Sequence, residues 1–392
     1  MALDVDAVRR RFPALARPVA YLDGPGGSQV PDVVIEAMRA HLERGTANDG
    51  GAFATSRQTA ELVAAARAAA ADLTGSAAEE IAFGPNMTTL NFLLAHAVAR
   101  TLRGGDEIVV TQLDHDANVA PWVRVAEDHG LVVREAPVRQ DGTLDAADVE
   151  ALLGDRTRVV AFTLASNALG TITDAPRIAA AAHAAGALAW ADGVHFAPHR
   201  RPDRGALGVD VLLCSPYKIF GPHLGIAAVR RDLAEALPAD RVRPASQDPP
   251  GHRFETGTPS FEALAGFTAA VGYLRGLGNG DLDAAYAAIR AHEDALTRHA
   301  LERLSTVDGV TVHGPAGVSD RTPTFCLTVD GRAPRAVAER LAGGGIFCWD
   351  GDFYAPGPLR ALGLTEGAVR AGFLHYSTLG EVDRLADALR SV

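Results

Sequence analysis

The sequence predicts an α/β protein with a mostly parallel sheet, followed by a smaller α+β unit towards the C-terminus. Between about residues 80 and 230, short apolar runs alternate with helical stretches, which is typical of a parallel sheet covered on both faces. The runs have the length of strands and are bounded by Gly, Asp or Ser. After residue 260, two long helical stretches precede shorter strand patterns, which predicts a separate layer of structure.

The N-terminal region is predicted to be helical. Residues 4–12 form a short predicted helix capped by Asp4. A longer helix is predicted over residues 31–44, with apolar residues on one face and Gly45 after its end, and another over residues 58–73.

Five apolar runs predict the core strands of the sheet, and helices are predicted between them. The predicted strands are Glu107–Thr111, Val159–Thr163, Ala187–Ala191, Val209–Cys214 and Ile226–Val229. The predicted helices cover residues 88–103, 118–129, 145–153, 176–185 and 232–237. Because ligands of such sheets bind at the carboxyl ends of the strands, polar residues that follow these runs are candidates for a site.

The C-terminal third has a different order of elements. A polar, Pro-rich segment at 240–260 is predicted to be a connector, and residues 260–304 form two long helices. Strands are then predicted at 310–313, 324–329, 346–349 and 368–374, with helices near 334–342 and 381–391. We therefore predict a large domain over residues 18–260 and a small domain made of residues 1–17 and 261–392.

Composition argues against several classes of protein. The net charge is −11 and no basic run exceeds Arg9–Arg11, whereas nucleic-acid binders usually present a basic face. The sequence shows no secretory signal and no apolar stretch long enough to span a membrane. Cys214, Cys326 and Cys348 form no CxxC pair. We expect a soluble cytoplasmic protein with no nucleic-acid or membrane partner and no metal site.

Lysine usage singles out one residue. Of the 37 Lys and Arg residues, only Lys218 is a lysine. A guanidinium stays protonated, whereas an amine can lose its proton and condense with a carbonyl group. Lys218 follows a predicted strand, where a cofactor would lie. The alternative is a chance lysine on the surface.

Asp192 suggests which cofactor Lys218 would hold. It ends the preceding predicted strand, and a carboxylate there can pair with a protonated pyridine nitrogen and keep the ring electron-poor. An Asp and a Lys on consecutive strand ends predict an imine between Lys218 and pyridoxal 5′-phosphate (PLP). Taken alone, Asp192 could also be a helix cap or a turn residue.

Further candidates follow other strands. The imidazole of His115 can stack on a flat pyridine ring, and Asn167 can donate to a ring hydroxyl. The stretch 84–89 opens a predicted helix, whose N–H groups suit a phosphate. No P-loop motif is present, and the glycines at 24–27 do not complete GxGxxG, so a nucleotide enzyme is disfavoured. Arg370, within a strand pattern, could hold a substrate carboxylate through two parallel hydrogen bonds, or be a surface residue.

Together these motifs resemble the class V aminotransferase superfamily of PLP enzymes, of fold type I. Within it, the chain is similar to cysteine desulfurase-like proteins related to the SufS/NifS group. The resemblance runs from Tyr21-Leu-Asp-Gly to Tyr376-Ser-Thr and the closing helical stretch. It implies a large domain with a mostly parallel seven-stranded sheet, a smaller α+β C-terminal domain, PLP as the cofactor and an L-amino acid as the substrate.

The resemblance also implies roles for single residues. Lys218 would be the Schiff-base lysine, Asp192 would pair with the pyridine nitrogen, and His115 would stack on the ring. These three are the catalytic candidates. His195, where relatives often have Gln, would face the ring hydroxyl, and Arg370 would bind the substrate carboxylate.

The phosphate would be held by several residues at once. Asn86, Met87 and Ser215 match positions that hold it in the family, and Tyr217, where many relatives have His, would reach it as in kynureninases. The segment 253–259 resembles one that members insert into the site of the neighbouring subunit. It implies a homodimer with shared active sites, in which Thr258 contacts the phosphate of the partner.

One departure from the family concerns sulfur chemistry. Persulfide-forming desulfurases carry a nucleophilic Cys on a loop of the small domain, but alignment of that stretch places Tyr354 at or near its position. Cys348 lies six residues earlier, within a strand pattern, where a Cys is usually inert. The nearby aromatic residues, Trp349 and Tyr354 among them, predict contacts with a substrate larger than cysteine.

We therefore predict a PLP-dependent enzyme that cleaves a C–S bond by β-elimination, on cysteine or an S-substituted cysteine, without the usual persulfide-forming loop. An aminotransferase, an epimerase or a kynureninase-like C–C lyase of the same superfamily are alternatives. A PLP-fold scaffold without turnover is the alternative from a different class, but a scaffold needs none of Lys218, Asp192 and Arg370.

Overall fold

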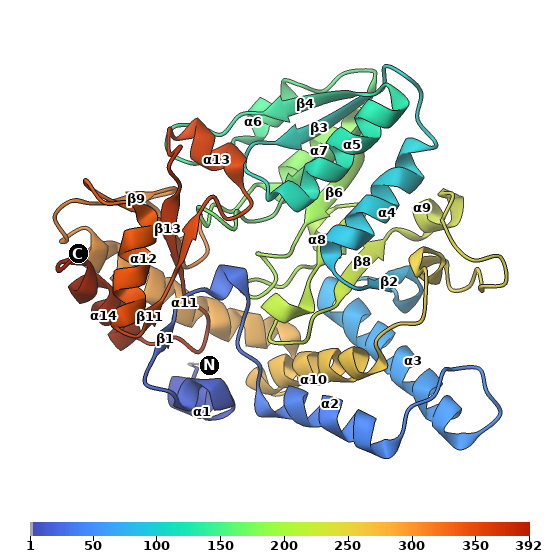
Figure 1. The fold of residues 1–392 in the computed structure, drawn as a ribbon. Helices are drawn as coiled ribbons and strands as arrows, with labels where there is room; N and C mark the ends of the chain where they lie inside the picture. The colour runs from blue at the N-terminus through green and yellow to red at the C-terminus, as the bar shows by residue number, and fades with distance from the viewer. Residues whose placement is uncertain (1–2) are drawn as a thin grey trace.

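A computed structural model of the protein describes residues 3–392 and contains a seven-stranded sheet, a four-stranded sheet and one two-stranded pair (Figure 1). The predicted α/β class, with a mostly parallel large sheet, is confirmed. In Figure 1, the large sheet and its helices occupy one side of the molecule, and the four-stranded sheet, with the C-terminus nearby, occupies the other.

The large sheet has one reversed strand. Its order is β2-β8-β7-β6-β5-β3-β4, and β8 runs in the opposite direction to the other six strands. The strands are β2 (Ile81–Gly84), β3 (Glu107–Thr111), β4 (Val132–Ala136), β5 (Thr157–Thr163), β6 (Leu188–Asp192), β7 (Val211–Cys214) and β8 (Gly225–Val229). Five of them match predicted runs. The four-residue β2 and the edge strand β4, which is mostly exposed and contains Arg134 and Glu135, were not predicted.

Apolar side chains on both faces explain why the strands read as continuous hydrophobic runs. Ile108 and Val110 point into one core with the helices α4 (Met87–Ala99) and α5 (Ala120–His129). The intervening Val109 belongs to the opposite core. That core is shared by α3 (Ala54–Thr74), α6 (Ala146–Glu150), α7 (Ala175–Ala184) and α10 (Phe261–Leu277).

The four-stranded sheet is antiparallel and forms the third core. Its order is β12-β13-β10-β9, with β9 (Val310–His313), β10 (Thr324–Val329), β12 (Trp349–Gly351) and β13 (Ala368–Gly372). The helices α11 (Leu282–Leu304), α12 (Pro334–Gly343) and α14 (Leu379–Leu389) pack against it. The remaining helices are α1 (Val5–Arg10), α2 (Asp32–Arg44), α8 (Arg204–Leu207), α9 (Arg231–Ala236) and α13 (Pro356–Ala361).

The predicted strand at 346–349 consists of two strands that belong to different sheets. β11 (Ile346–Phe347) pairs in parallel with β1 (Ala20–Tyr21), whereas β12 pairs with β13. Cys348 joins the two strands and belongs to neither. The predicted limits of the two domains stay a prediction. α10, with which the small domain is predicted to begin, packs against α2 and α3 of the predicted large domain.

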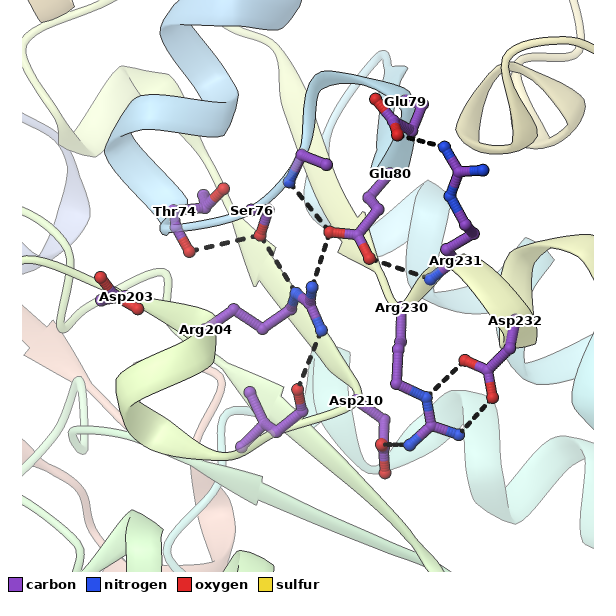
Figure 2. Close-up of polar contacts among 12 residues, drawn as sticks. Thr74, Ser76, Glu79, Glu80, Asp203, Arg204, Asp210, Arg230, Arg231 and Asp232 are labelled. Atoms are coloured by element: carbon purple, nitrogen blue, oxygen red, sulfur yellow. Dashed lines mark hydrogen bonds and ion pairs between the residues drawn. The ribbon is translucent and has the colours of Figure 1, made fainter.

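A polar network fastens the large sheet at the end opposite to the predicted site (Figure 2). Arg204 donates to Ser76 at 3.0 Å and to Glu80 at 2.6 Å, and Glu80 also accepts from the backbone N–H of Arg231. Arg230, just after β8, pairs with Asp210, just before β7. These contacts fix the start of β7, whose other end carries Lys218.

Within residues 3–392, no helix combines the length and the apolar character that a membrane crossing requires.

Candidate active site

The candidate residues meet where the parallel strands end. His115 follows β3, Asn167 follows β5, Asp192 is the last residue of β6, and Lys218 lies in the single turn of 3₁₀ helix, Pro216–Lys218, after β7. Nine of the ten predicted cofactor residues line one cavity, and they come from five separate stretches of the chain. The cavity is lined by Asn86, Met87, Thr88, His115, Ala117, Thr163, Ala165, Asn167, Asp192, Val194, His195, Ser215, Tyr217 and Lys218.

Lys218 is buried, with 5% of its surface exposed. Burial lowers the pKa of its amine from 10.5 to about 8, and the positive charge of Arg370 acts in the same direction. The carboxylate of Asp192 opposes this shift. An amine with a lowered pKa is available in the unprotonated form that attacks a carbonyl group.

Asp192 faces the same cavity from the neighbouring strand. Its Oδ1 accepts a hydrogen bond from the backbone N–H of Val194 at 2.8 Å, which fixes the carboxyl group. Burial raises its pKa, and the nearby charge of Lys218 lowers it. A positively charged partner in the cavity would therefore stabilise the ionised form.

His115 presents a neutral ring to the cavity. Its Nδ1 accepts from the N–H of Ala117 at 3.0 Å, which leaves the proton of the neutral ring on Nε2. Burial lowers its pKa to about 3, and the charges of Lys218 and Arg370 add to the shift. The ring of Tyr354 is stacked against it, with centroids 5.9 Å apart and 27° between the planes.

A buried network supports His115 from behind. Asp114 accepts from the hydroxyl of Thr111 and, at 2.8 Å, from Nδ2 of Asn118. Asn118 accepts in turn from Asn91, which also accepts from the indole of Trp190 at 2.9 Å. Burial raises the pKa of Asp114 to about 8. These side chains fix the turn that carries His115, and nothing in their spacing along the sequence indicates that they meet.

The start of α4 forms the polar end of the cavity. Asn86 caps this helix by accepting from the N–H of Thr89 at 2.8 Å. The first N–H groups of a helix have no partner within it, which makes the start of α4 suitable for a phosphate. Gly225 of β8 lies directly beneath, and a Cβ there would be 2.3 Å from the carbonyl carbon of Asn86. Only glycine allows this close approach.

Two polar atoms at the cavity have no hydrogen-bond partner in the described structure. They are Oδ1 of Asn167 and Nδ1 of His195, and both residues are buried. Because buried polar atoms are nearly always paired, such atoms indicate room for a further polar group. The amine of Lys218 can react with the aldehyde of the predicted cofactor, and the carboxyl group of Asp192 can pair with its pyridine nitrogen. The imidazole of His115 can stack on its ring, the two unpaired atoms can bond its hydroxyl, and the start of α4 can hold its phosphate. The residues of the cavity therefore fit PLP.

Arg370 lies close to the cavity but already has partners. It is 4% exposed, donates to Asp23 at 2.8 Å and to the carbonyl oxygen of Asn167 at 3.2 Å, and lies 4.7 Å over the ring of Phe353. The position of Asp23 beside Arg370 was not predicted, although it lies in the Tyr21-Leu-Asp-Gly motif. A substrate carboxylate bound by Arg370 would have to share the guanidinium with Asp23.

Trp349 and Cys348 lie in a wider cleft next to the cavity. This cleft has a volume of about 1070 Å³ and meets the cavity at Tyr217, which lines both. Trp349 is 52% exposed, and Cys348 is half-buried between β11 and β12. Burial raises the pKa of the Cys348 thiol to about 12, so the thiol stays protonated near neutral pH.

The segment 352–355 is fastened to the site by backbone contacts. The carbonyl oxygen of Phe353 accepts from Nδ2 of Asn167 at 2.9 Å, and that of Tyr354 accepts from the N–H of Asp116 at 2.8 Å. Phe353 and Tyr354 both have positive φ angles, of 60° and 53°. Side chains rarely adopt this conformation, so the contacts hold a strained turn over His115.

Thr258 does not line the cavity with the other predicted residues. It borders a separate hollow formed by β2, α4 and the segment 254–260. The segment is anchored by Glu255, which accepts from Arg67 at 2.7 Å and from the N–H of Phe83 at 2.9 Å. Within one chain, Thr258 is therefore apart from Lys218.

Comparisons with known proteins agree with this geometry. A family model described as aminotransferase class-V matches residues 20–385. A cysteine desulfurase from Pectobacterium atrosepticum is 32% identical, over 100% of this chain and 98% of that protein. Probable cysteine desulfurase 2 of Mycobacterium leprae is also 32% identical, over 100% of this chain and 97% of that protein.

Solved structures show the same fold. The apo structure of a cysteine desulfurase from Thermococcus onnurineus NA1 superposes with a TM-score of 0.92 at 27% identity, covering 100% of this chain and 98% of that one. A cysteine desulfurase from Escherichia coli superposes with a TM-score of 0.87 at 26% identity, covering the same shares of the two chains. With the match of the family model over nearly its whole length, the chain belongs to the class V aminotransferase family.

Proposed function

We propose that this enzyme cleaves the C–S bond of cysteine or of an S-substituted cysteine by β-elimination, without a cysteine nucleophile of its own. Its cofactor is PLP, and it is related to the cysteine desulfurases. The observation that carries the proposal is the segment 352–355, where the aromatic ring of Tyr354 covers His115. The thiol of Cys348 lies in the neighbouring cleft and has a raised pKa.

Lys218, Asp192 and His115 would each have a different role in the reaction. When bound, PLP supplies an electron-poor ring that accepts electrons from a bond at Cα of the amino acid. The amine of Lys218, with its lowered pKa, removes the Cα proton as a general base. Asp192, fixed by its hydrogen bond from Val194, would hold a proton at the pyridine nitrogen of the cofactor, and the neutral His115 would stack on its ring.

Elimination needs no sulfur acceptor in the protein. After the Cα proton has moved to Lys218, the Cβ–S bond breaks and its electron pair leaves with the sulfur. The leaving thiolate or sulfide then takes up a proton, and the remaining three-carbon fragment hydrolyses to pyruvate and ammonia. Arg370 would hold the carboxylate in place during these steps, and the wide cleft beyond Tyr217 would take the sulfur substituent.

An absorbance spectrum before and after a panel of L-amino acids tests the proposal. The panel contains cysteine and cysteines with larger sulfur substituents, with assays for pyruvate, sulfide and released thiol. We expect a yellow protein that releases pyruvate and thiol in equal amounts. Pyruvate from none of the panel would refute the lyase activity. A colour change to the amine form of the cofactor would indicate an aminotransferase, and a protein that stays colourless with PLP would indicate a scaffold.

The persulfide route is tested separately by one substitution. If Cys348→Ala leaves the release of sulfide from cysteine unchanged, the thiol takes no part. Loss of that activity with normal cofactor absorbance would refute our proposal in favour of a persulfide on Cys348. Cys326→Ala is a matched control, because Cys326 is buried in β10 and does not line the cleft.

We further propose a cytoplasmic homodimer in which Thr258 completes the site of the partner. The separation of Thr258 from Lys218 within one chain supports this arrangement. Subunits carrying Lys218→Ala and subunits carrying Thr258→Ala, each weakly active or inactive alone, should regain activity when mixed, because each mixed dimer then has one intact site. No gain on mixing, with exchange of subunits verified, would show that the sites are not shared.

A further inference from the structure

His195 connects the cofactor cavity to the interior of the protein. It is 2% exposed, and its Nε2 lies 3.1 Å and 3.0 Å from the hydroxyl groups of Thr322 and Thr324. Its Nδ1 has no partner among the described residues. Thr324 is the first residue of β10 and Thr322 lies two residues before it, so the ring is fixed on one side by the edge of the four-stranded sheet.

Two buried polar side chains lie behind His195. The ring of His199 meets that of His195 edge to face, with centroids 5.2 Å apart and 75° between the planes. Its Nδ1 lies 3.0 Å from Oε2 of Glu293, in the middle of α11. His199 and Glu293 are each only 1% exposed.

The pair cannot be explained as a stabilising ion pair alone. Among residues 3–392, the carboxyl group of Glu293 has one ion-pair partner besides His199, which is Arg200 at 3.9 Å. Its Oε1 has no hydrogen-bond partner there. A buried carboxyl group with so few contacts costs free energy that apolar residues of similar size would not cost. A carboxyl group behind a histidine does have one well-known effect, since it fixes the tautomer and the orientation of the ring.

We propose that Glu293 and His199 are positioning residues for His195, and that they set the charge environment of the cofactor through it. The contact between Nδ1 of His199 and Oε2 of Glu293 holds the ring of His199 in one orientation. The orientation of His199 then fixes the edge against which His195 packs, with its free Nδ1 at the cavity. This inference deepens the proposed function and rests on PLP binding at Lys218.

Several charged groups act on the same region. His195 is kept neutral mainly by burial, which holds its pKa well below the usual range. The charged or titratable groups around His195 and the His199–Glu293 pair are Lys218, Arg370, Arg200, Asp294, Arg290, Tyr286, His292 and His375. Those around the amine of Lys218 are Arg370, Asp192, Asp23 and His115. Among these groups, Glu293 is the carboxyl group that contacts His199.

The pH dependence of the visible absorbance of the PLP-bound enzyme, without substrate, tests the inference. This absorbance follows the proton held at the Lys218 nitrogen. Glu293→Gln preserves the shape of the side chain but removes the negative charge, so the proton is lost more easily. We expect the midpoint to fall by about half a pH unit. The matched control is Glu381→Gln, since Glu381 is also buried and pairs with an arginine, but caps α14 far from the cavity.

Substitutions of His199 separate positioning from charge. His199→Phe keeps an aromatic edge against His195 and keeps the carboxyl group of Glu293, but loses the hydrogen bond between them, so a changed midpoint in this variant reports positioning. His199→Asn, whose amide can take the place of Nδ1–H, should stay closer to the wild type. An unchanged midpoint in both Glu293→Gln and His199→Phe, with normal circular dichroism, would overturn the inference alone. A wild-type protein that remains colourless with PLP would instead overturn the proposed function and this inference with it.

Discussion

Tyr354 allows the strain in the turn over His115 to be measured. Its φ of 53° is a conformation that costs a residue with a Cβ about 1 kcal/mol relative to glycine. The stacking of its ring on His115 opposes this cost. Because Tyr354 is 71% exposed, the stacking contributes only about 0.5 kcal/mol, at the lower end for aromatic pairs.

Two substitutions at this position should therefore differ in stability. Tyr354→Ala loses the stacking and keeps the strain, so we expect a loss of about 0.5 kcal/mol. Tyr354→Gly loses the stacking and relieves the strain, so it should be about 1 kcal/mol more stable than Tyr354→Ala. Denaturant unfolding of the cofactor-free protein measures the difference without interference from PLP.

Gly363 provides the calibration. Its φ is 74° and a Cβ added there would meet nothing within 4 Å, so Gly363→Ala measures the conformational cost alone. The difference between the two Tyr354 variants should match the loss in Gly363→Ala. If Tyr354→Ala is as stable as Tyr354→Gly while Gly363→Ala is destabilised, the positive φ at position 354 does not destabilise the protein and the turn over His115 is not strained.

Three further predictions concern the cofactor, the anchored segment and the cleft. Cofactor-free protein should capture PLP faster as the pH rises through about 8, because only the unprotonated amine of Lys218 reacts; a rate in rapid-mixing absorbance that does not change with pH would contradict this. Glu255→Gln should destabilise the protein to denaturant by about 3 kcal/mol, because it leaves Arg67 buried without its charged partner, whereas Glu36→Gln, in an exposed pair, should have no measurable effect. Trp349→Ala should raise KM several-fold for cysteines with large sulfur substituents and leave cysteine itself unaffected, and equal effects on all substrates would argue against a role of the cleft in specificity.

The sequence was sufficient for the parts of the site that follow from strand order. His115, Asn167, Asp192 and Lys218 each follow an apolar run, and parallel strands bring such positions to one edge of a sheet. Their chemistry could therefore be interpreted together before the fold was known. Edge strand β4 was missed because its exposed face is polar, which removes the hydrophobic pattern on which the prediction depended.

Contacts between side chains distant in the sequence could not be predicted. Asp23 pairs with Arg370 across 347 positions and His199 with Glu293 across 94, and no periodicity links such residues. The positive φ of Tyr354 was also hidden, since the sequence offers neither Gly nor Asn at that position to indicate a left-handed turn.

The burial of the only lysine side chain also governs which reagents can modify the folded protein. Because Lys218 is 5% exposed, amine-directed cross-linkers and dyes find no lysine on the surface, and a dimer would have to be trapped through carboxyl or guanidinium groups instead. The same property makes the chain a selective reporter. After reduction of its bond to the cofactor with borohydride, a single lysine-containing peptide would carry the entire label, and its mass would identify the attachment site without any mutation.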